Sequence, residues 1–282
     1  MPAPAPGQAV ALTAGWRAEL ELRCERRGQR TVLAHKRQFG PLTLQRAFYP
    51  EGDLCHLYML HPPGGVVGGD RLSIDLGLQS RANALLTTPG AAKYYRSAGA
   101  EALLEQRLSV AAGASLEWFP QETILFPGAR VRLHTEIALQ TGANLIGWEM
   151  LSLGRPSIGE RFDPGYLHAG LSLSRDGRPL LLERLRISSP RHLDGASGLR
   201  GHPLVGTMLA TGCDAIMLEK VRASLQIPHE LLFGITLLDD VLVARALGPA
   251  IEPMQAVFRA LWAELRPSLL SREACLPRIW ST

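Results

Sequence analysis

Apolar and polar residues alternate along most of the chain between residue 16 and about residue 190. In WRAELELRC (residues 16–24), every second residue from Ala18 onward is apolar, and charged residues stand between them. The same period of two recurs in RLSIDLGLQ (residues 71–79) and VRLHTEIALQ (residues 131–140). Because successive side chains of a β-strand point to opposite faces, this pattern predicts strands with one buried face.

Turn signals separate the alternating runs. The chain carries Pro-Gly pairs that begin at Pro63, Pro89, Pro127 and Pro164. In RDGR, Asp176 and Gly177 predict a two-residue hairpin turn, since this pair tolerates positive φ angles. Strand after strand with short turns between them predicts packed β-sheets and a mainly β fold.

The pattern changes after about residue 200. In CDAIMLEKVRASLQ, Asp214 predicts the N-cap of a helix that runs to about Leu225. The segment LLFGITLLDDVLVARALG then predicts a hairpin that turns at Asp239 and Asp240.

A second helix is predicted near the C-terminus. In PMQAVFRALWAELRP, the apolar residues recur at helical spacing, so we expect a helix that opens at Pro253 and stops before Pro267. Together these elements predict a helix–hairpin–helix block from about residue 203, packed on the sheets as a subdomain.

The composition is that of a soluble globular protein, with 282 residues, of which 46% are hydrophobic and 20% charged. The formal net charge of +4 is spread along the chain without a run of Lys and Arg, which argues against nucleic-acid binding. No apolar run approaches the roughly 18 residues that a membrane span needs. We therefore expect neither nucleic acid nor a membrane as a partner.

The N-terminus and the cysteines bear on localisation. The opening MPAPAPGQAVALTAG lacks the charged region of a signal peptide, and it predicts a disordered lead-in over residues 1–14. The four cysteines, at positions 24, 55, 213 and 275, form no CxxC pair. A disulfide framework is therefore not expected, and the sequence favours a cytoplasmic protein.

The segment HPPGGVVGGD (residues 61–70) is unusually rich in glycine. Its four glycines are Gly64, Gly65, Gly68 and Gly69, and it ends on Asp70. It lacks the Gly-Lys-Ser/Thr of a P-loop, and a predicted strand follows it rather than a helix, which argues against a nucleotide site. Two interpretations stay open. The glycines form a tight corner, or they let the backbone or a partner approach closely while Asp70 lies at the edge of a cavity.

Nucleophilic catalysis finds little support, because the chain has no GxSxG motif. Cys55, His56 and His61 are candidate ligands for a transition metal. However, neighbouring residues of a strand point to opposite faces, so Cys55 and His56 would diverge. The ligand spacing of a structural zinc site is absent.

Two carboxylates fall in apolar rows. Glu183 in LLLERLRIS and Glu149 in NLIGWEMLSL each share a strand face with leucines. Buried acids are rare unless they are paired, hydrogen-bonded or metal-bound. Three interpretations stay open: an ion pair with an arginine, a polar water-filled path that includes Asp70, or the catalytic pair of a hydrolase such as a glycosidase.

A family resemblance covers nearly the whole chain. GPLTLQRAFYPEGDLCHLYMLHPPGGVVGGD is followed by TTPGAAKYYRS, LEWFPQETILFPGA, GWEMLSLGRPSIGE, LLLERL and LPRIW. These segments, between Trp16 and Trp280, resemble the UreD (UreH) family of urease accessory proteins. The resemblance implies a single UreD-type domain over residues 15–282, with layered β-sheets in a helical arrangement and two C-terminal helices.

The resemblance implies a scaffold rather than an enzyme. Such a protein binds urease apoprotein and UreF, UreF recruits the GTPase UreG, and together they deliver nickel to the urease active site. The family resemblance also implies an internal nickel tunnel lined by acids at the positions of Asp70, Glu149 and Glu183, with nickel in transit and no permanently bound cofactor. The position of Glu149 commonly carries Asp, and Ala92 stands where some relatives have a hydroxyl. The alternative is a β-rich hydrolase that uses Glu149 and Glu183.

Overall fold

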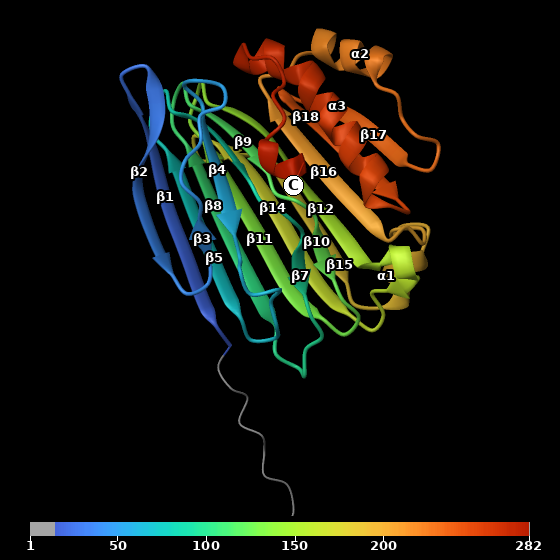
Figure 1. The fold of residues 1–282 in the computed structure, drawn as a ribbon. Coiled ribbons are helices and arrows are strands. Elements are labelled where there is room, and N and C mark those ends of the chain that lie inside the picture. The colour runs from blue at the N-terminus through green and yellow to red at the C-terminus, as the bar shows by residue number, and fades with distance from the viewer. Residues whose placement is uncertain (1–14, 282) are drawn as a thin grey trace, which may run out of the picture.

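Two β-sheets packed face to face make up most of the molecule, and helices cover the outer face of the second sheet at its C-terminal side (Figure 1). The structure, a computed structural model, describes residues 15–281. The lead-in that the sequence predicts over residues 1–14 therefore lies outside the described residues.

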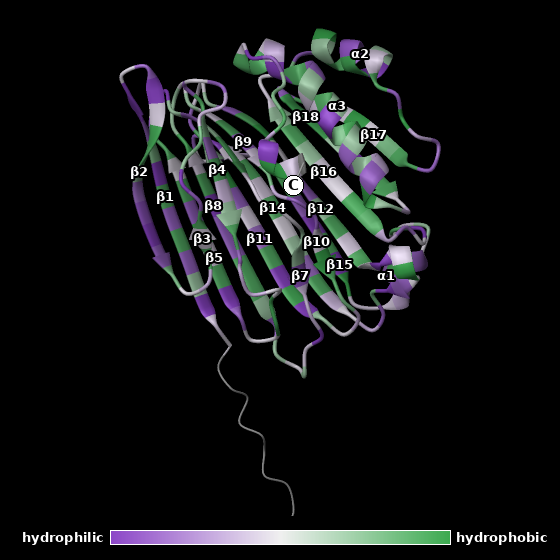
Figure 2. Cartoon of the chain, in the orientation of Figure 1, coloured by the Kyte–Doolittle hydropathy of each residue, from purple (hydrophilic) through white to green (hydrophobic). Residues whose placement is uncertain are grey.

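The first sheet has seven strands, in the order β15-β14-β11-β8-β5-β1-β2. These strands are β1 (Arg17–Arg27), β2 (Arg30–Phe39), β5 (Arg71–Leu78), β8 (Ala102–Val110), β11 (Arg130–Leu139), β14 (Tyr166–Arg175) and β15 (Arg178–Ile187). The alternation that predicted strands is visible here, because apolar and polar bands succeed one another along each strand (Figure 2).

The second sheet has 11 strands, with the main order β17-β18-β16-β12-β9-β6-β4-β3 and three short strands attached beside it. The strands are β3 (Thr43–Leu44), β4 (Cys55–Leu60), β6 (Asn83–Thr87), β7 (Ala92–Tyr94), β9 (Ser115–Phe119), β10 (Thr123–Leu125), β12 (Asn144–Arg155), β13 (Glu160–Arg161), β16 (Leu204–Thr211), β17 (Leu232–Leu238) and β18 (Val241–Gly248).

The chain passes back and forth between the two sheets as it advances. In the first sheet, β5, β8 and β11 pair in parallel. Along the chain, β6 follows β5, β9 follows β8 and β12 follows β11, and these three strands pair in parallel in the second sheet. Each circuit therefore adds one strand to both sheets. The prediction of a mainly β fold, with layered sheets in a helical arrangement, is confirmed.

The predicted caps and turns explain where several elements begin and end. Asp214 caps α2, because its side chain accepts a hydrogen bond from the Met217 amide at 2.8 Å. Asp176 and Gly177, with φ of 49° and 78°, turn the chain between β14 and β15, and Asp239 with φ of 52° turns it between β17 and β18. The helical segments are α1 (Pro190–Asp194), α2 (Ala215–Ser224), α3 (Ile251–Leu270), η1 (Pro156–Ile158) and η2 (Arg278–Ser281).

Helix α3 differs from its prediction at both ends. It begins at Ile251 rather than at Pro253, and it continues through Pro267 to Leu270 instead of stopping before the proline. A proline inside a helix removes one backbone hydrogen bond. Here the side chain just before it, Arg266, is fully buried in ion pairs. Tertiary contacts on this turn therefore outweigh the local cost of the proline.

The C-terminal elements continue the second sheet. Strand β16 pairs antiparallel with β12, and the β17–β18 hairpin is added at its other side. Helices α2 and α3 pack their apolar side chains on the outer face of these strands. Among the described helices, none combines the length and the apolar character needed to cross a membrane.

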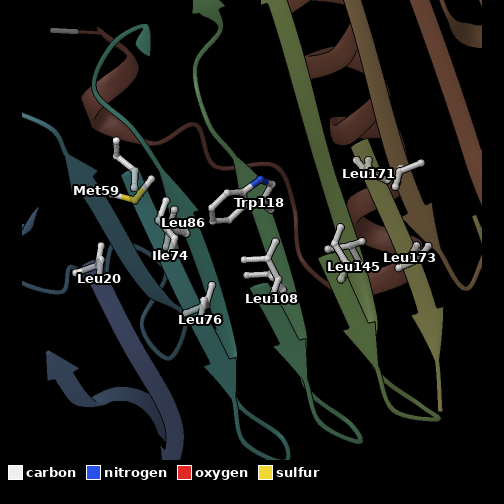
Figure 3. Close-up of a cluster of buried hydrophobic side chains, with 14 of the residues drawn as sticks. Leu20, Met59, Ile74, Leu76, Leu86, Leu108, Trp118, Leu145, Leu171 and Leu173 are labelled. Carbon is white, nitrogen blue, oxygen red and sulfur yellow. The ribbon is translucent and has the colours of Figure 1, made fainter. Parts of the chain in front are cut away.

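The main core lies between the sheets. Leu20, Ile74 and Leu108 of the first sheet meet Leu86 and Trp118 of the second, and all are at most 2% exposed (Figure 3). Burying such side chains contributes about 1.5–3 kcal/mol each. A polar group on an inward-facing position of either sheet therefore stands out against this core.

Candidate functional site

Polar residues interrupt the core along one row of the first sheet. Gln106 on β8, Thr135 on β11 and Glu183 on β15 occupy successive register positions, with Leu171 of β14 between the last two. Because register partners share a face of a sheet, all of them point toward the second sheet. Glu183, on the edge strand, ends this row.

A matching row crosses the second sheet. Glu149 on β12 is paired in register with Thr207 on β16, which is paired in turn with Arg245 on β18. The two rows face each other and are joined by hydrogen bonds. Gln106 donates to the Thr135 hydroxyl at 2.8 Å, and the Thr135 hydroxyl donates to the Glu149 carboxylate.

The environment of Glu149 raises the pKa of its carboxyl into the neutral range. The pKa of its carboxyl is raised to about 7, chiefly by burial and also by the negative charge of Glu183, while the Thr135 hydrogen bond lowers it. A carboxyl with this pKa changes its charge near pH 7. It can therefore release a proton when a cation arrives and take one up when the cation leaves.

Glu183 is held by partners from the second sheet. The Arg245 Nε donates to Glu183 Oε1 at 2.7 Å, and the Thr207 hydroxyl donates to Oε2 at 3.1 Å. Of the three interpretations of its inward position, the ion pair with an arginine is thus present. The same carboxylate also lines a cavity, so it is accessible to a small ligand as well as to Arg245.

Cavities connect the two acids. A cavity of about 290 Å³ is lined by His61, Gly64 and Gly65 at one end and by Glu149 at the other, and Ala92 also lines it. A second cavity, of about 350 Å³, is lined by Glu149 and Glu183.

A third, smaller space shares the lining residue Glu149 with both of these cavities. It has a volume of about 10 Å³, room for about one water molecule, and it is lined by Thr135, Glu149 and Thr207. Glu149 is therefore a wall of all three spaces between the sheets.

Asp70 lies elsewhere. It is 5% exposed, and its carboxylate accepts hydrogen bonds from the Trp16 amide at 2.8 Å and the Val67 amide at 2.9 Å. Among the described residues that line the cavities above, Asp70 is absent. Its charge does act on the cavity wall, since it opposes the fall in the pKa of His61 that burial causes. The carboxylate therefore ties the start of β1 to the glycine-rich segment.

Two glycines of this segment lie so close to neighbouring side chains that a Cβ atom would not fit. A Cβ on Gly65 would lie 2.3 Å from the Tyr95 ring, and one on Gly68 would lie 2.2 Å from the Ser97 hydroxyl. Gly69 has a φ of 96°, while Gly64 faces open space. The two interpretations of this segment thus combine: it is a tight corner, and its missing side chains let β7 and the following loop pack against it.

The candidate metal ligands Cys55, His56 and His61 are not brought together. Cys55 belongs to the core between the sheets, whereas His56 contacts Glu51 at 2.8 Å. His61 lines the 290 Å³ cavity, and burial lowers the pKa of its ring. Within residues 15–281, no group of three or more His, Cys, Asp or Glu is placed to hold a metal ion.

Sequence reasoning missed four polar members of the two rows, namely Gln106, Thr135, Thr207 and Arg245. The signal was present for two of them. Thr135 stands at an inward position of an alternating run, and Gln106 does so between Leu104 and Leu108. Arg245 follows four consecutive buried residues, 241–244, so no alternation indicates its face. Their hydrogen-bond partners come from other strands, so their joint role was hidden.

Comparison with known proteins points to one family. The family described as UreD urease accessory protein matches residues 17–281. The chain is 48% identical over 273 residues to urease accessory protein UreD of Alcanivorax borkumensis, an alignment that covers 95% of this chain and 93% of that one. It is 50% identical to UreD of Azoarcus sp. (strain BH72), with 95% of each chain covered, and 45% identical to UreD of Klebsiella aerogenes, with 96% and 98% covered.

Proposed function

The chain belongs to the UreD urease accessory protein family, and from this premise we propose that it is a non-catalytic scaffold for the insertion of nickel into urease. In this proposal it works in the cytoplasm, binds urease apoprotein and UreF, and is linked to the GTPase UreG through UreF. The name shared by its relatives, urease accessory protein, supports a role in assisting urease rather than in catalysis.

One observation carries the nickel part of the proposal: Glu149 lines all three of the cavities described above, of which one also borders the glycine-rich segment and another also borders Glu183. Carboxylate oxygens bind divalent cations, and an ion in transit must be bound weakly enough to leave. Single carboxylates spaced along a path, with hydroxyls and water as further ligands, meet this need better than a closed cluster. Nickel is therefore cargo, which enters, passes Glu149 and reaches Glu183.

Asp70 has an indirect part in this path. Both of its oxygens accept backbone hydrogen bonds, so it holds the glycine-rich segment in shape at one end of the 290 Å³ cavity. Its charge also acts on Tyr94, a residue of the cavity wall, where it raises the pKa together with burial. A buried negative charge behind the wall attracts cations into the cavity.

The test replaces both acids of the path. In Glu149→Gln/Glu183→Gln, the chain keeps its shape but loses two carboxylates. We expect co-purification with UreF and urease apoprotein to be unchanged and urease activation to fall, with partial recovery at higher nickel concentration. The matched control is Glu136→Gln, because Glu136 is exposed on the opposite face of β11, next to Thr135.

Two results would contradict the proposal. Full activation by the double variant at limiting nickel would remove the path from the mechanism. A collapsed melting temperature together with loss of the complex would assign both acids to the fold.

A hydrolase is the second candidate, on one observation. The pKa of Glu149 is about 7, while Glu183 is ion-paired to Arg245. An uneven pair of carboxyls is also the arrangement of an acid and a base in glycosidases. A panel of chromogenic glycosides and esters tests this: turnover by the purified chain that disappears in Glu183→Gln would favour the hydrolase.

A further inference from the structure

The ion pair between Arg245 and Glu183 stands at the outer end of the space between the sheets. Arg245 is on β18 of the second sheet and Glu183 is on the edge strand β15 of the first, 62 residues apart in sequence. The side chain of Arg245 is 49% exposed and that of Glu183 is 21% exposed. The pair therefore joins the two sheets where the interior meets the surface.

The cavities place Arg245 on a boundary. Together with Glu149 and Glu183 it lines the 350 Å³ cavity, and it also lines a neighbouring hollow of about 560 Å³. Gly198 and Arg200, in the loop before β16, line the outer hollow but not the inner cavity, whereas Glu149 and Glu183 line the inner cavity but not the outer hollow. The guanidinium of Arg245 is thus the charged group shared by the inner cavity and the outer hollow.

We propose that Arg245 is the gate of the inter-sheet path: its guanidinium occupies the Glu183 carboxylate and must swing away before a divalent cation passes between the inner cavity and the outer hollow. This inference rests on the proposed function and adds a residue and a regulating contact to it. The gate is a cation that competes with the cargo for one carboxylate.

The chemistry of arginine supports this role. The guanidinium stays protonated at every physiological pH, so it repels a divalent cation and weakens its binding to Glu183 for as long as the pair is closed. The contact also uses Oε1, while Thr207 donates to Oε2. Both oxygens of Glu183 therefore have a partner in the closed state, and the departure of Arg245 frees Oε1 for a cation and removes the positive charge beside it.

The exposure of the pair allows it to open. Partly exposed ion pairs contribute little to stability, because water solvates both groups when they separate. The outer hollow next to Arg245 offers room for the displaced side chain. By contrast, an ion pair buried on all sides would block the path permanently.

The chain offers a matched control in a second ion pair between the same parts of the molecule. Arg175, at the end of β14, contacts Asp240, in the β17–β18 turn, at 2.9 and 2.8 Å. Arg175 lines neither the inner cavity nor the outer hollow. Arg175→Gln therefore removes an arginine–carboxylate bridge between the sheets without touching the path.

The experiment measures Ni²⁺ binding to the full chain, in complex with UreF where that is needed for solubility. Equilibrium dialysis with Ni²⁺ is carried out on the wild type, Arg245→Gln and Arg175→Gln. We expect Arg245→Gln to bind Ni²⁺ tighter by about fivefold or more, the range of a coupling between two ligands of one site. Arg175→Gln is expected to bind as the wild type does, and Arg245→Lys, which keeps the charge, is expected to lie between them.

A double variant isolates the shared carboxylate. In a Glu183→Gln background, Arg245→Gln is expected to leave Ni²⁺ binding unchanged, since the two residues act through one group. Circular dichroism and melting curves identify a variant that has lost its fold, in which case Arg245→Lys decides.

The outcomes separate the gate from the path. Equal Ni²⁺ binding by the wild type and Arg245→Gln, with urease activation still lost in Glu149→Gln/Glu183→Gln, would overturn the gate and leave the path standing. Full activation by that double-acid variant would overturn the path and, with it, the gate.

Discussion

At the scale of single residues, the surroundings of Glu149 decide its chemistry. Its inward position follows from the alternation of β12, but the pKa of about 7 comes from burial and from Glu183 on another sheet. Its partner Thr135 lies across the space between the sheets. A glutamate on an exposed strand face, such as Glu136, has none of these neighbours.

This shift predicts how stability depends on pH. Because the pKa of Glu149 is higher in the fold than the ordinary value of 4.5, its contribution to stability is present below about pH 4.5 and is lost as the pH rises through 7. The full loss is on the order of 3 kcal/mol. Glu149→Gln does not titrate, so its free energy of unfolding should exceed that of the wild type at pH 8, and the two should converge near pH 5.

Urea unfolding at both pH values, in buffer with a chelator, measures this difference. The control Glu136→Gln should follow the wild type at each pH. A Glu149→Gln variant that is no more stable than the wild type at pH 8 would show that the carboxylate is well solvated in the cavity.

The glycine-rich segment gives a second prediction at this scale. Gly65→Ala places a methyl group 2.3 Å from the Tyr95 ring and 2.8 Å from the Lys93 carbonyl oxygen, whereas Gly64→Ala points into open space. Overpacking of this kind costs about 1–3 kcal/mol. Thermal melting should therefore show a lower Tm for Gly65→Ala and an almost unchanged Tm for Gly64→Ala. Equal melting temperatures of the two variants would mean that Tyr95 moves aside freely.

At the scale of elements, a buried cluster of charges holds α3 on the second sheet. Arg266 is fully buried, and its guanidinium contacts Glu117 of β9 at 2.9 Å and Glu51 at 2.7 Å. Trp262, one turn earlier, donates to the same Glu117 at 2.7 Å. Glu51 also contacts His56, so the histidine considered as a metal ligand belongs to this cluster.

Removing the arginine leaves the buried carboxylates of Glu117 and Glu51 without the guanidinium that balances their charge, although Trp262 and His56 still contact them. Arg266→Met should therefore destabilise the chain by about 3–5 kcal/mol, measured by urea unfolding. The control is Arg222→Met, since Arg222 pairs with Glu219 on the exposed side of α2, and such a change should stay within about 0.5 kcal/mol. If Arg266→Met were as stable as the control, α3 would depend on apolar packing alone.

At the scale of the whole molecule, large apolar side chains remain on the described surface. They include Ile216 on α2, Leu182 on β15 and Trp16 before β1, which are 79%, 66% and 60% exposed. These positions lie on different elements and form no single continuous apolar patch, and single exposed apolar residues are common on proteins. They are therefore candidate contact points for the partners proposed above.

We therefore expect the isolated chain to self-associate. Light scattering of the purified chain should show oligomers or aggregates that grow with concentration, and UreF should suppress them by covering apolar surface. Ile216→Asp, Leu182→Asp and Trp16→Asp, tested singly, show which position drives association. A chain that stays monodisperse at high concentration, with no change on adding UreF, would argue against partner-covered apolar surface.

The features that the sequence determined by itself depend on interactions between residues close together in the chain. A period of two places each side chain on one strand face, so the strands, the β14–β15 hairpin and the inward position of Glu149 and Glu183 could all be predicted. The cap at Asp214 and the turn at Asp176 depend on neighbouring residues only. Each of these features is decided within a few residues, where backbone geometry leaves few choices.

Tertiary structure decided the rest, because its causes lie far apart in the chain. Strand order and register bring Arg245 to Glu183 across 62 residues and Arg266 to Glu117 across 149. Packing around Arg266 carries α3 through Pro267, where local rules predict an end. The fold also decided that the Asp70 carboxylate accepts hydrogen bonds from the Trp16 and Val67 amides instead of lining a cavity. A period in the sequence gives the face on which a side chain lies, but only the pairing of strands gives the groups that it meets there.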